Sequence, residues 1–171
     1  GMSADNGPLL LDLWHNMMRR AEQGRYDDAM ARLYRLSEWV AQWHLKTHCG
    51  IDTGDVPREA VPPEMAGALV AGRAGKIQIG LHDAWKLAAA RCPDSRLAGL
   101  YAGPWQKLSN CLSGRNNSIL AHGFAPVTAG EWKEAEALAG ETLFPLLRES
   151  VAGKGGLPPQ LPTEIQPFLD A

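Results

Sequence analysis

At 171 residues and 18.5 kDa the chain has the size of one domain, and its 45% hydrophobic content is enough to fill a single core. A formal net charge of -2 and a pI near 6.2 exclude a protein that holds nucleic acid through a broad cationic surface. No apolar run approaches the roughly 18 residues that a membrane-spanning helix needs, so we expect no membrane partner. Three cysteines without a CxxC pair, Cys49, Cys92 and Cys111, favour the reducing cytoplasm over a secreted disulfide scaffold.

The first fifty residues predict two helices joined by a short turn. Pro8 suits the first turn of a helix that Gly24 ends, and Asp27 and Asp28 suit the positive start of a second helix that runs to about Cys49. Helices joined by so short a turn should pack antiparallel. Their inward faces are predicted from apolar residues at helical spacing: Leu10, Leu13, Trp14, Met17 and Ala21 on the first, and Met30, Leu33, Leu36, Val40, Trp43 and Thr47 on the second.

The middle of the chain is also predicted to be helical. Five segments are expected in order: a loop over residues 50–63, a weak helix over 64–70, and helices over 76–91, 95–101 and 104–121. The helix over 76–91 is predicted despite a brief strand-like alternation of Ile77 and Ile79. Gly114 weakens the last helix by about 1 kcal/mol relative to alanine, so a break just before Arg115 stays open.

The end of the chain divides into a helix and a tail. Thr128 and Glu131 match a capping box that opens a helix, and Pro145 should kink or shorten it. Its buried side is predicted from Trp132, Ala135, Leu138 and Ala139. We therefore expect one helical bundle over residues 2–150 and a tail without regular periodicity over 151–171.

The most informative segment is RNNSILAHG, residues 115–123. In a helix, the seven-residue step from Arg115 to His122 falls roughly 20° short of two turns, so both side chains share a face, and Ser118 joins them. Gly123 would cap the helix and leave the imidazole in its last turn. A face with a guanidinium, a hydroxyl and an imidazole is suited to binding and cleaving a phosphodiester.

The same segment resembles the R-x(4-6)-H motif of HEPN ribonucleases. More closely, the stretches LYRLSEWVAQWHLKTHCGIDTGDV, KIQIGLHDAWKL and RNNSILAHGF together resemble the HEPN portion of CRISPR-associated proteins that join a nucleotide-sensing CARF domain to a HEPN effector. The resemblance covers about residues 26–126. It implies a compact, all-α, antiparallel bundle that forms a homodimer, cuts single-stranded RNA without metal or cofactor, and takes part in CRISPR-linked antiviral defence.

The resemblance also implies roles for individual residues. Arg115, Asn116 and His122 match the catalytic motif, and we predict that Asn117 and Ser118 contact the substrate. Histidine, with an ordinary pKa near 6.5, can take a proton from the ribose 2'-OH or give one to the leaving 5'-oxygen. Arginine can bind two phosphate oxygens at once. The amide of Asn116 could orient the imidazole or the phosphate.

Geometry gives an independent reason for a dimer. Along one helix the backbones of Arg115 and His122 are about 10 Å apart, and one motif supplies a single imidazole. Two copies across a two-fold axis supply two histidines and two arginines around one phosphate. The sequence therefore predicts a composite site at a homodimer interface.

One departure from the resembled proteins concerns their sensor. The 171 residues leave no room for a CARF domain and show no alternation of strands and helices. We expect either a separated effector or a stand-alone HEPN protein, with any CARF sensor on another chain or missing.

Other functions are alternatives. A HEPN-like bundle that binds RNA or a protein without cutting is the main one, and a peptide-binding repeat is suggested by GRYDDA at residues 24–29, although no second copy follows. The spacing of His44, His48 and Cys49 is compatible with a metal, but no second ligand pair is evident. The outer face of the second helix, with Arg32, Arg35, Trp39 and Lys46, is interpreted as solvated, with an interface or an RNA-stacking patch as the alternative. His15 and His82 are interpreted as surface or half-buried packing residues.

Overall fold

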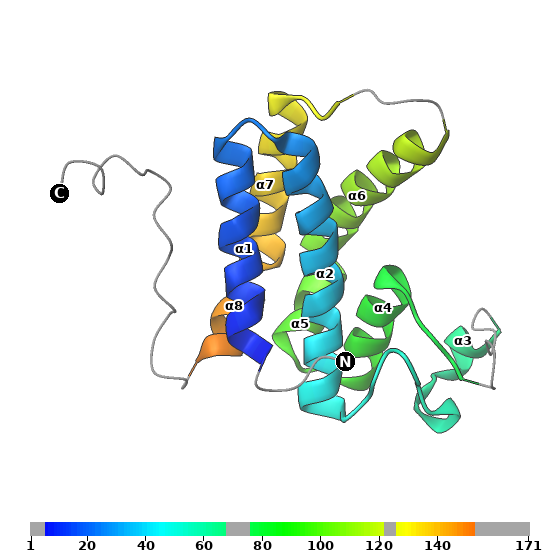
Figure 1. Cartoon of the computed structure of the whole chain (residues 1–171). Coiled ribbons are helices and arrows are strands. Elements are labelled where there is room, and N and C mark those ends of the chain that lie inside the picture. The colour runs from blue at the N-terminus through cyan, green and yellow to red at the C-terminus, as the bar shows by residue number, and fades with distance from the viewer. Residues whose placement is uncertain (1–5, 68–75, 122–125, 153–171) are drawn as a thin grey trace.

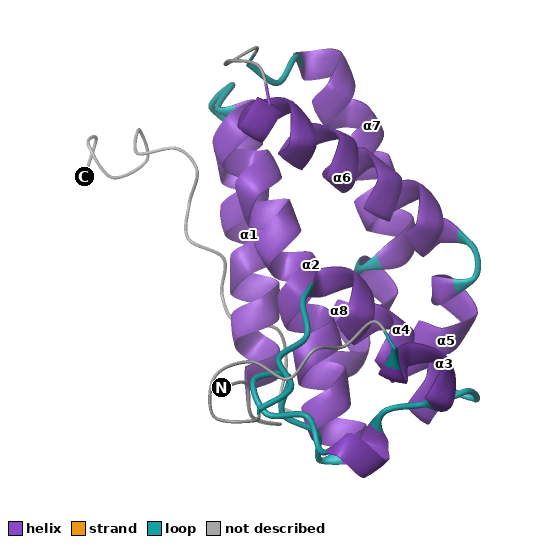
Figure 2. Ribbon diagram, turned by 90° about the vertical axis from the view of Figure 1, so that its right-hand side faces the viewer, coloured by secondary structure: helices purple, strands orange, loops and turns teal. Residues whose placement is uncertain are grey.

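The computed structural model describes residues 6–67, 76–121 and 126–152 (Figure 1). Within this part, residues 114–121 are described by their backbone alone. Regular structure in these residues is helical, as Figure 2 shows, which confirms the predicted all-α class. The α-helices are α1 (Gly7–Glu22), α2 (Tyr26–Cys49), α3 (Pro63–Ala66), α4 (Leu81–Arg91), α5 (Arg96–Tyr101), α6 (Pro104–Ala121), α7 (Ala129–Thr142) and α8 (Phe144–Val151). No helix among the described residues is long and apolar enough to cross a bilayer.

Helices α1 and α2 form the predicted antiparallel hairpin (Figure 1). Gly24 takes the left-handed conformation at φ 71°, which lets the chain reverse between them. The predicted inner face is correct except at Thr47, which is exposed. A straight helix drifts relative to a seven-residue repeat, so by the last turns of α2 the buried face has moved to His44 and Leu45.

Helix α4 begins later than the sequence predicts. Residues 76–80 are not helical, because Val56 donates its backbone N–H to Ile77 at 2.9 Å and Ile79 donates to Thr53 at 3.1 Å. Both isoleucines are buried, as expected for alternate residues of an extended segment. Their spacing therefore indicated extended backbone and not a helix. The predicted helix over 64–70 is reduced to the single turn of α3, and residues 68–70 lie outside the described part.

The remaining helix boundaries follow the sequence closely. Ser95 caps α5 by accepting from the backbone N–H of Ala98 at 3.2 Å. Thr128 and Glu131 form the predicted capping box of α7. Pro145 lies in the first turn of α8 and separates it from α7, as expected for a proline that cannot continue a helix. Residues 153–171 of the predicted tail lie outside the described residues.

The core is organised around two stacked tryptophans from different helices. Trp85 of α4 and Trp105 of α6 lie with ring centroids 4.0 Å apart and planes 7° from parallel. The indole Nε1 of Trp85 donates to the backbone carbonyl of Ser37 on α2 at 2.9 Å. Helices α2, α4 and α6 are therefore joined at one point, which fixes where the motif-bearing helix leaves the bundle.

Helices α1 and α8 approach closely enough that one position requires glycine. A Cβ added at Gly7 would overlap the backbone carbonyl oxygen of Ser150, whose hydroxyl points to the carbonyl of Gly7 at 3.4 Å. We expect Gly7→Ala to lower the free energy of unfolding by about 2 kcal/mol, because backbone must move to make room. Urea denaturation measures this. Gly140→Ala in α7 is the matched control: its Cβ meets nothing within 4 Å, so a gain of about 0.5 kcal/mol is expected. Equal effects of the two substitutions would show that the α1 and α8 contact is looser than described.

Candidate active site

The predicted catalytic segment lies at the C-terminal end of α6. The helix runs without interruption through Gly114 to Ala121, so the break that glycine left open before Arg115 does not occur. Arg115, Asn116, Asn117 and Ser118 therefore share one continuous helix. Their side chains are not described, and His122 lies outside the described residues. The grouping of these side chains around a substrate stays a prediction.

The first half of α6 holds the helix in the bundle. Trp105, Leu108 and Leu112 are buried at one-helix-turn spacing, and α7 packs alongside. Figure 1 shows α6 diverging from α2 towards its C-terminal end. The first half of α6 is thus anchored in the bundle, and its C-terminal end, which includes the backbone of Arg115, lies away from α2 (Figure 1).

His82 of α4 forms hydrogen bonds with α6 just before the motif. The Nδ1 of His82 lies 3.3 Å from the Ser109 hydroxyl, and its Nε2 lies 3.1 Å from the Ser113 hydroxyl. A neutral imidazole can donate to one hydroxyl and accept from the other. Ser113 precedes Arg115 by two residues, so this link fixes α6 at the point where the motif begins. The sequence interpretation of His82 as a packing residue missed the link, although the two serines lie four residues apart on one helix face.

A second link holds the chain just after the motif. Val127 donates its backbone N–H to a carboxylate oxygen of Asp27 at 3.0 Å. Asp27 lies in the first turn of α2, where the sequence predicted only a favourable charge at a helix start. The described residues on either side of the motif are therefore held at two points, by His82 of α4 and by Asp27 of α2.

The three residues on α2 whose spacing is compatible with a metal, His44, His48 and Cys49, contact different neighbours. Cys49 faces Cys92, with the two sulfurs 2.9 Å apart, and His48 lies 3.7 Å from Glu149. His44 is 1% exposed and lies beside His48, with ring centroids 4.4 Å apart and planes tilted by 42°. It has no hydrogen-bond partner at either ring nitrogen within the described part of the chain. Among the described residues, no three His, Cys, Asp or Glu side chains gather where they could hold a metal ion.

Burial lowers the pKa of His44 to about 4, with a smaller contribution from His48. The folded protein keeps this imidazole neutral while the unfolded chain binds a proton near pH 6.5, so stability falls as the pH drops from 6.5 towards 4. We expect this to cost roughly 3 kcal/mol over that window. His44→Leu should remove that part of the acid sensitivity, seen as the difference between urea denaturation curves of variant and wild type at pH 7.5 and 5. His15→Leu, at a half-buried site on α1, is the control that should keep it. Parallel losses in wild type and His44→Leu would contradict the assignment.

Two of the three cations on the outer face of α2, Arg32 and Arg35, have partners on the same helix. Arg35 pairs with Glu38 at 2.9 Å and lies over the Trp39 ring at 5.2 Å, while Arg32 donates to the Asp28 carbonyl at 3.0 Å. These bonds lie within one helix and are partly exposed, which favours the solvated interpretation of this face over an RNA-stacking patch.

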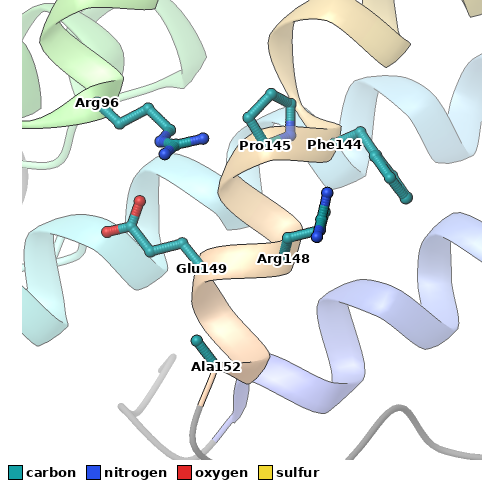
Figure 3. Close-up of a pocket in the computed structure, with 6 residues that line it drawn as sticks. All are labelled: Arg96, Phe144, Pro145, Arg148, Glu149 and Ala152. Atoms are coloured by element: carbon teal, nitrogen blue, oxygen red, sulfur yellow. The ribbon is translucent and has the colours of Figure 1, made fainter.

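An open pocket lies away from the motif, between the start of α5 and helix α8. Its volume is about 570 Å³, and it is lined by Arg96, Phe144, Pro145, Arg148, Glu149 and Ala152. Figure 3 shows the Arg96 guanidinium and the Glu149 carboxylate on one side of α8, with Arg148 and the Phe144 ring on the other. Neither arginine forms an ion pair with another described residue, whereas Glu149 lies near His48. Two available cations beside an exposed aromatic ring could bind an anionic ligand.

An all-helical bundle in which α6 carries Arg115 near its C-terminal end fits a HEPN-type domain. Comparison with known families agrees: residues 2–143 match the family described as Csm6 HEPN domain. The chain belongs to this family, which confirms the resemblance to the HEPN portion of CRISPR-associated proteins. None of the curated proteins and none of the solved structures compared with the chain matches it significantly.

Proposed function

We propose that this chain is a metal-independent endoribonuclease that cleaves single-stranded RNA at a composite site in a homodimer. Membership of a CRISPR-associated HEPN family supports a ribonuclease type of function. The observation that carries the proposal is the unbroken course of α6 across Gly114. It supports a continuous helix that carries Arg115 and ends at Ala121, next in sequence to the predicted His122.

The proposed chemistry assigns one task to each group. The Arg115 guanidinium binds two non-bridging phosphate oxygens and stabilises the charge that grows on them during attack. His122 moves a proton, either from the attacking 2'-OH or to the leaving 5'-oxygen. Asn116 orients the imidazole or the phosphate, and Asn117 and Ser118 contact the RNA. The products are a 2',3'-cyclic phosphate and a free 5'-OH.

A second subunit is required because one motif supplies a single imidazole. Cleavage needs one group to accept a proton and another to give one, and two motifs facing across a two-fold axis supply both. The divergence of the C-terminal end of α6 from α2 supports access by a second copy (Figure 1).

We also propose a setting for the activity. The free cysteines favour a reducing compartment, the cytoplasm, where the enzyme would act in CRISPR-linked antiviral defence. Control by a CARF sensor, on a separate chain or a further domain, would then set when the RNA is cut.

The direct test is cleavage of a fluorescent single-stranded RNA by the purified chain in EDTA. We expect cleavage that EDTA leaves unchanged, products ending in a cyclic phosphate, and no cleavage of the same sequence made of DNA, which lacks the attacking 2'-OH. Cleavage abolished by EDTA and restored by a divalent cation would overturn the metal-independent mechanism.

A second candidate function is an RNA-binding HEPN bundle that does not cut, and the arginine pocket favours it. Phe144 is 39% exposed and rests on Trp14 at 5.5 Å, so its outer face is available for a base while Arg96 and Arg148 are available for phosphates. Under this alternative, RNA binds without being cut, and Arg96→Gln with Arg148→Gln weakens binding in a fluorescence anisotropy titration. Arg58→Gln, at an exposed arginine away from the pocket, is the control. Cleavage that does not depend on the pocket arginines supports the nuclease instead.

A further inference from the structure

Two cysteines far apart in sequence meet at the ends of neighbouring helices. Cys49 is the last residue of α2, and Cys92 directly follows α4. Their sulfurs lie 2.9 Å apart, and both cysteines are half-buried free thiols. A disulfide bond measures roughly 2.0 Å, so the sulfurs would need to close by only about 0.9 Å to bond.

The backbone around this pair is held from both sides. Gly50 ends α2 in the left-handed conformation at φ 67°, and the backbone N–H of Cys92 donates to Ala88 at 3.1 Å. Further along α4, Trp85 bonds to the Ser37 carbonyl of α2. The helices are therefore fixed to each other before any bond forms between the sulfurs, and the thiols stay near one another in the folded state.

We propose that Cys49 and Cys92 form a redox modification site, a dithiol that peroxide converts to a disulfide in the folded protein. The thiolate of Cys92 attacks one peroxide oxygen, the O–O bond breaks, and hydroxide leaves and is protonated to water, which makes Cys92 a sulfenic acid. Cys49 then gives up its proton and attacks the Cys92 sulfur, so that the S–S bond forms, the S–O bond breaks and a second water leaves. The two thiols lose two electrons, which reduce both peroxide oxygens.

The protonation of Cys49 assigns these different roles to the two neighbouring thiols. Burial, with a smaller contribution from the contact with Cys92, raises the pKa of the Cys49 thiol to about 12, so Cys49 keeps its proton. Cys92 is therefore the sulfur that attacks the oxidant, and Cys49 the one that resolves the sulfenic acid. The third cysteine offers a natural comparison, because Cys111 on α6 is a half-buried free thiol and burial raises its pKa as well.

The test treats the reduced full chain with hydrogen peroxide, then alkylates the remaining thiols in denaturant and measures the intact mass. We expect a loss of about 2 Da on oxidation, a fall in alkylated thiols from three to one, and a cross-linked peptide containing Cys49 and Cys92, all reversed by dithiothreitol. The melting temperature should rise by about 5 °C, because the bond closes a long loop in the unfolded chain. In Cys49→Ser the sulfenic acid at Cys92 should persist and react with dimedone, whereas Cys111→Ser should form the disulfide as wild type does.

Two results would overturn the proposal. One is a bridge that forms no faster in the folded chain than in concentrated urea, because folding would then contribute nothing. The other is oxidation of Cys111 under conditions in which Cys49 and Cys92 stay reduced, so that alkylation still labels both of them completely. Neither result depends on RNA cleavage, so the disulfide proposal and the nuclease proposal are tested independently of each other.

Discussion

Replacing Arg115 or His122 with alanine is expected to lower the rate of RNA cleavage by at least about 100-fold each. Without Arg115 the phosphate loses the cation that binds two of its oxygens, and the charge that builds up during attack is no longer stabilised. Without His122 one proton transfer has no positioned acid or base. Loss of such a group typically lowers the rate by about 100-fold to 10,000-fold. Initial rates with a fluorescent RNA in EDTA measure both effects.

A control on the same helix separates catalysis from folding. Asn110 is exposed on α6, before the motif, so Asn110→Ala should cleave RNA at the wild-type rate. The three variants should melt within a few degrees of wild type, because none of these positions is assigned to the core. Full activity in both Arg115→Ala and His122→Ala would remove both residues from the proposed site. Loss of activity in Asn110→Ala as well would point to damage of α6 rather than to lost chemistry.

Trp85→Ala is expected to have the largest effect on stability, a loss of about 3 to 5 kcal/mol in the free energy of unfolding. The side chain is fully buried, stacks on Trp105 at 4.0 Å and donates to Ser37 at 2.9 Å, so alanine leaves a cavity where three helices meet. Because whole domains are stable by about 5 to 15 kcal/mol, a substantial fraction of the variant should unfold in mild urea.

The control for this substitution is a tryptophan on the outer face of α2. Trp39 is half-buried against the edge of the core and lies beside Arg35, so Trp39→Ala should cost about 1 to 2 kcal/mol, clearly less than Trp85→Ala. Urea denaturation followed by circular dichroism compares the two. A similar loss from both variants would show that the stack between α4 and α6 does not hold the core together.

Helix order and type could be predicted from sequence because these depend on local patterns. Gly24, Ser95 and the capping box at Thr128 each act within one turn of their own position, and the structure follows them closely. The start of α4 could not be placed in the same way. Ile77 is drawn out of the helix by its backbone bond to Val56, a partner from the preceding loop that helical periodicity does not include.

Contacts between helices far apart in sequence could not be predicted either, because periodicity describes one segment and not its partners. Periodicity assigns Trp85 and Trp105 to helices, but nothing in it says that the two rings stack. Cysteine counting alone likewise gave no reason to join Cys49 with Cys92, which meet only because α2 and α4 end side by side. The buried face of α2 could have been extended to His44, which follows Ser37 and Val40 at helical spacing.

The candidate site was predicted mainly from the motif and the resemblance it carries. The family match over residues 2–143 confirms the resemblance, and the continuous α6 removes the doubt that Gly114 raised. The contacts of His82 and Asp27 with residues on either side of the motif were not foreseen, because both residues belong to other helices. A short string can thus suggest candidate site residues, whereas the groups that hold the flanking backbone in place require the fold.

Mixing wild-type subunits with the Arg115→Ala, His122→Ala double variant tests the composite site most directly. The two forms are allowed to exchange subunits at a fixed total concentration, and the cleavage rate is measured as the wild-type fraction falls. If two intact motifs are required around one phosphate, only pairs of wild-type subunits cut, so the rate should fall as the square of the wild-type fraction. A rate that falls in direct proportion to that fraction would mean that each subunit cuts RNA alone and would contradict the account.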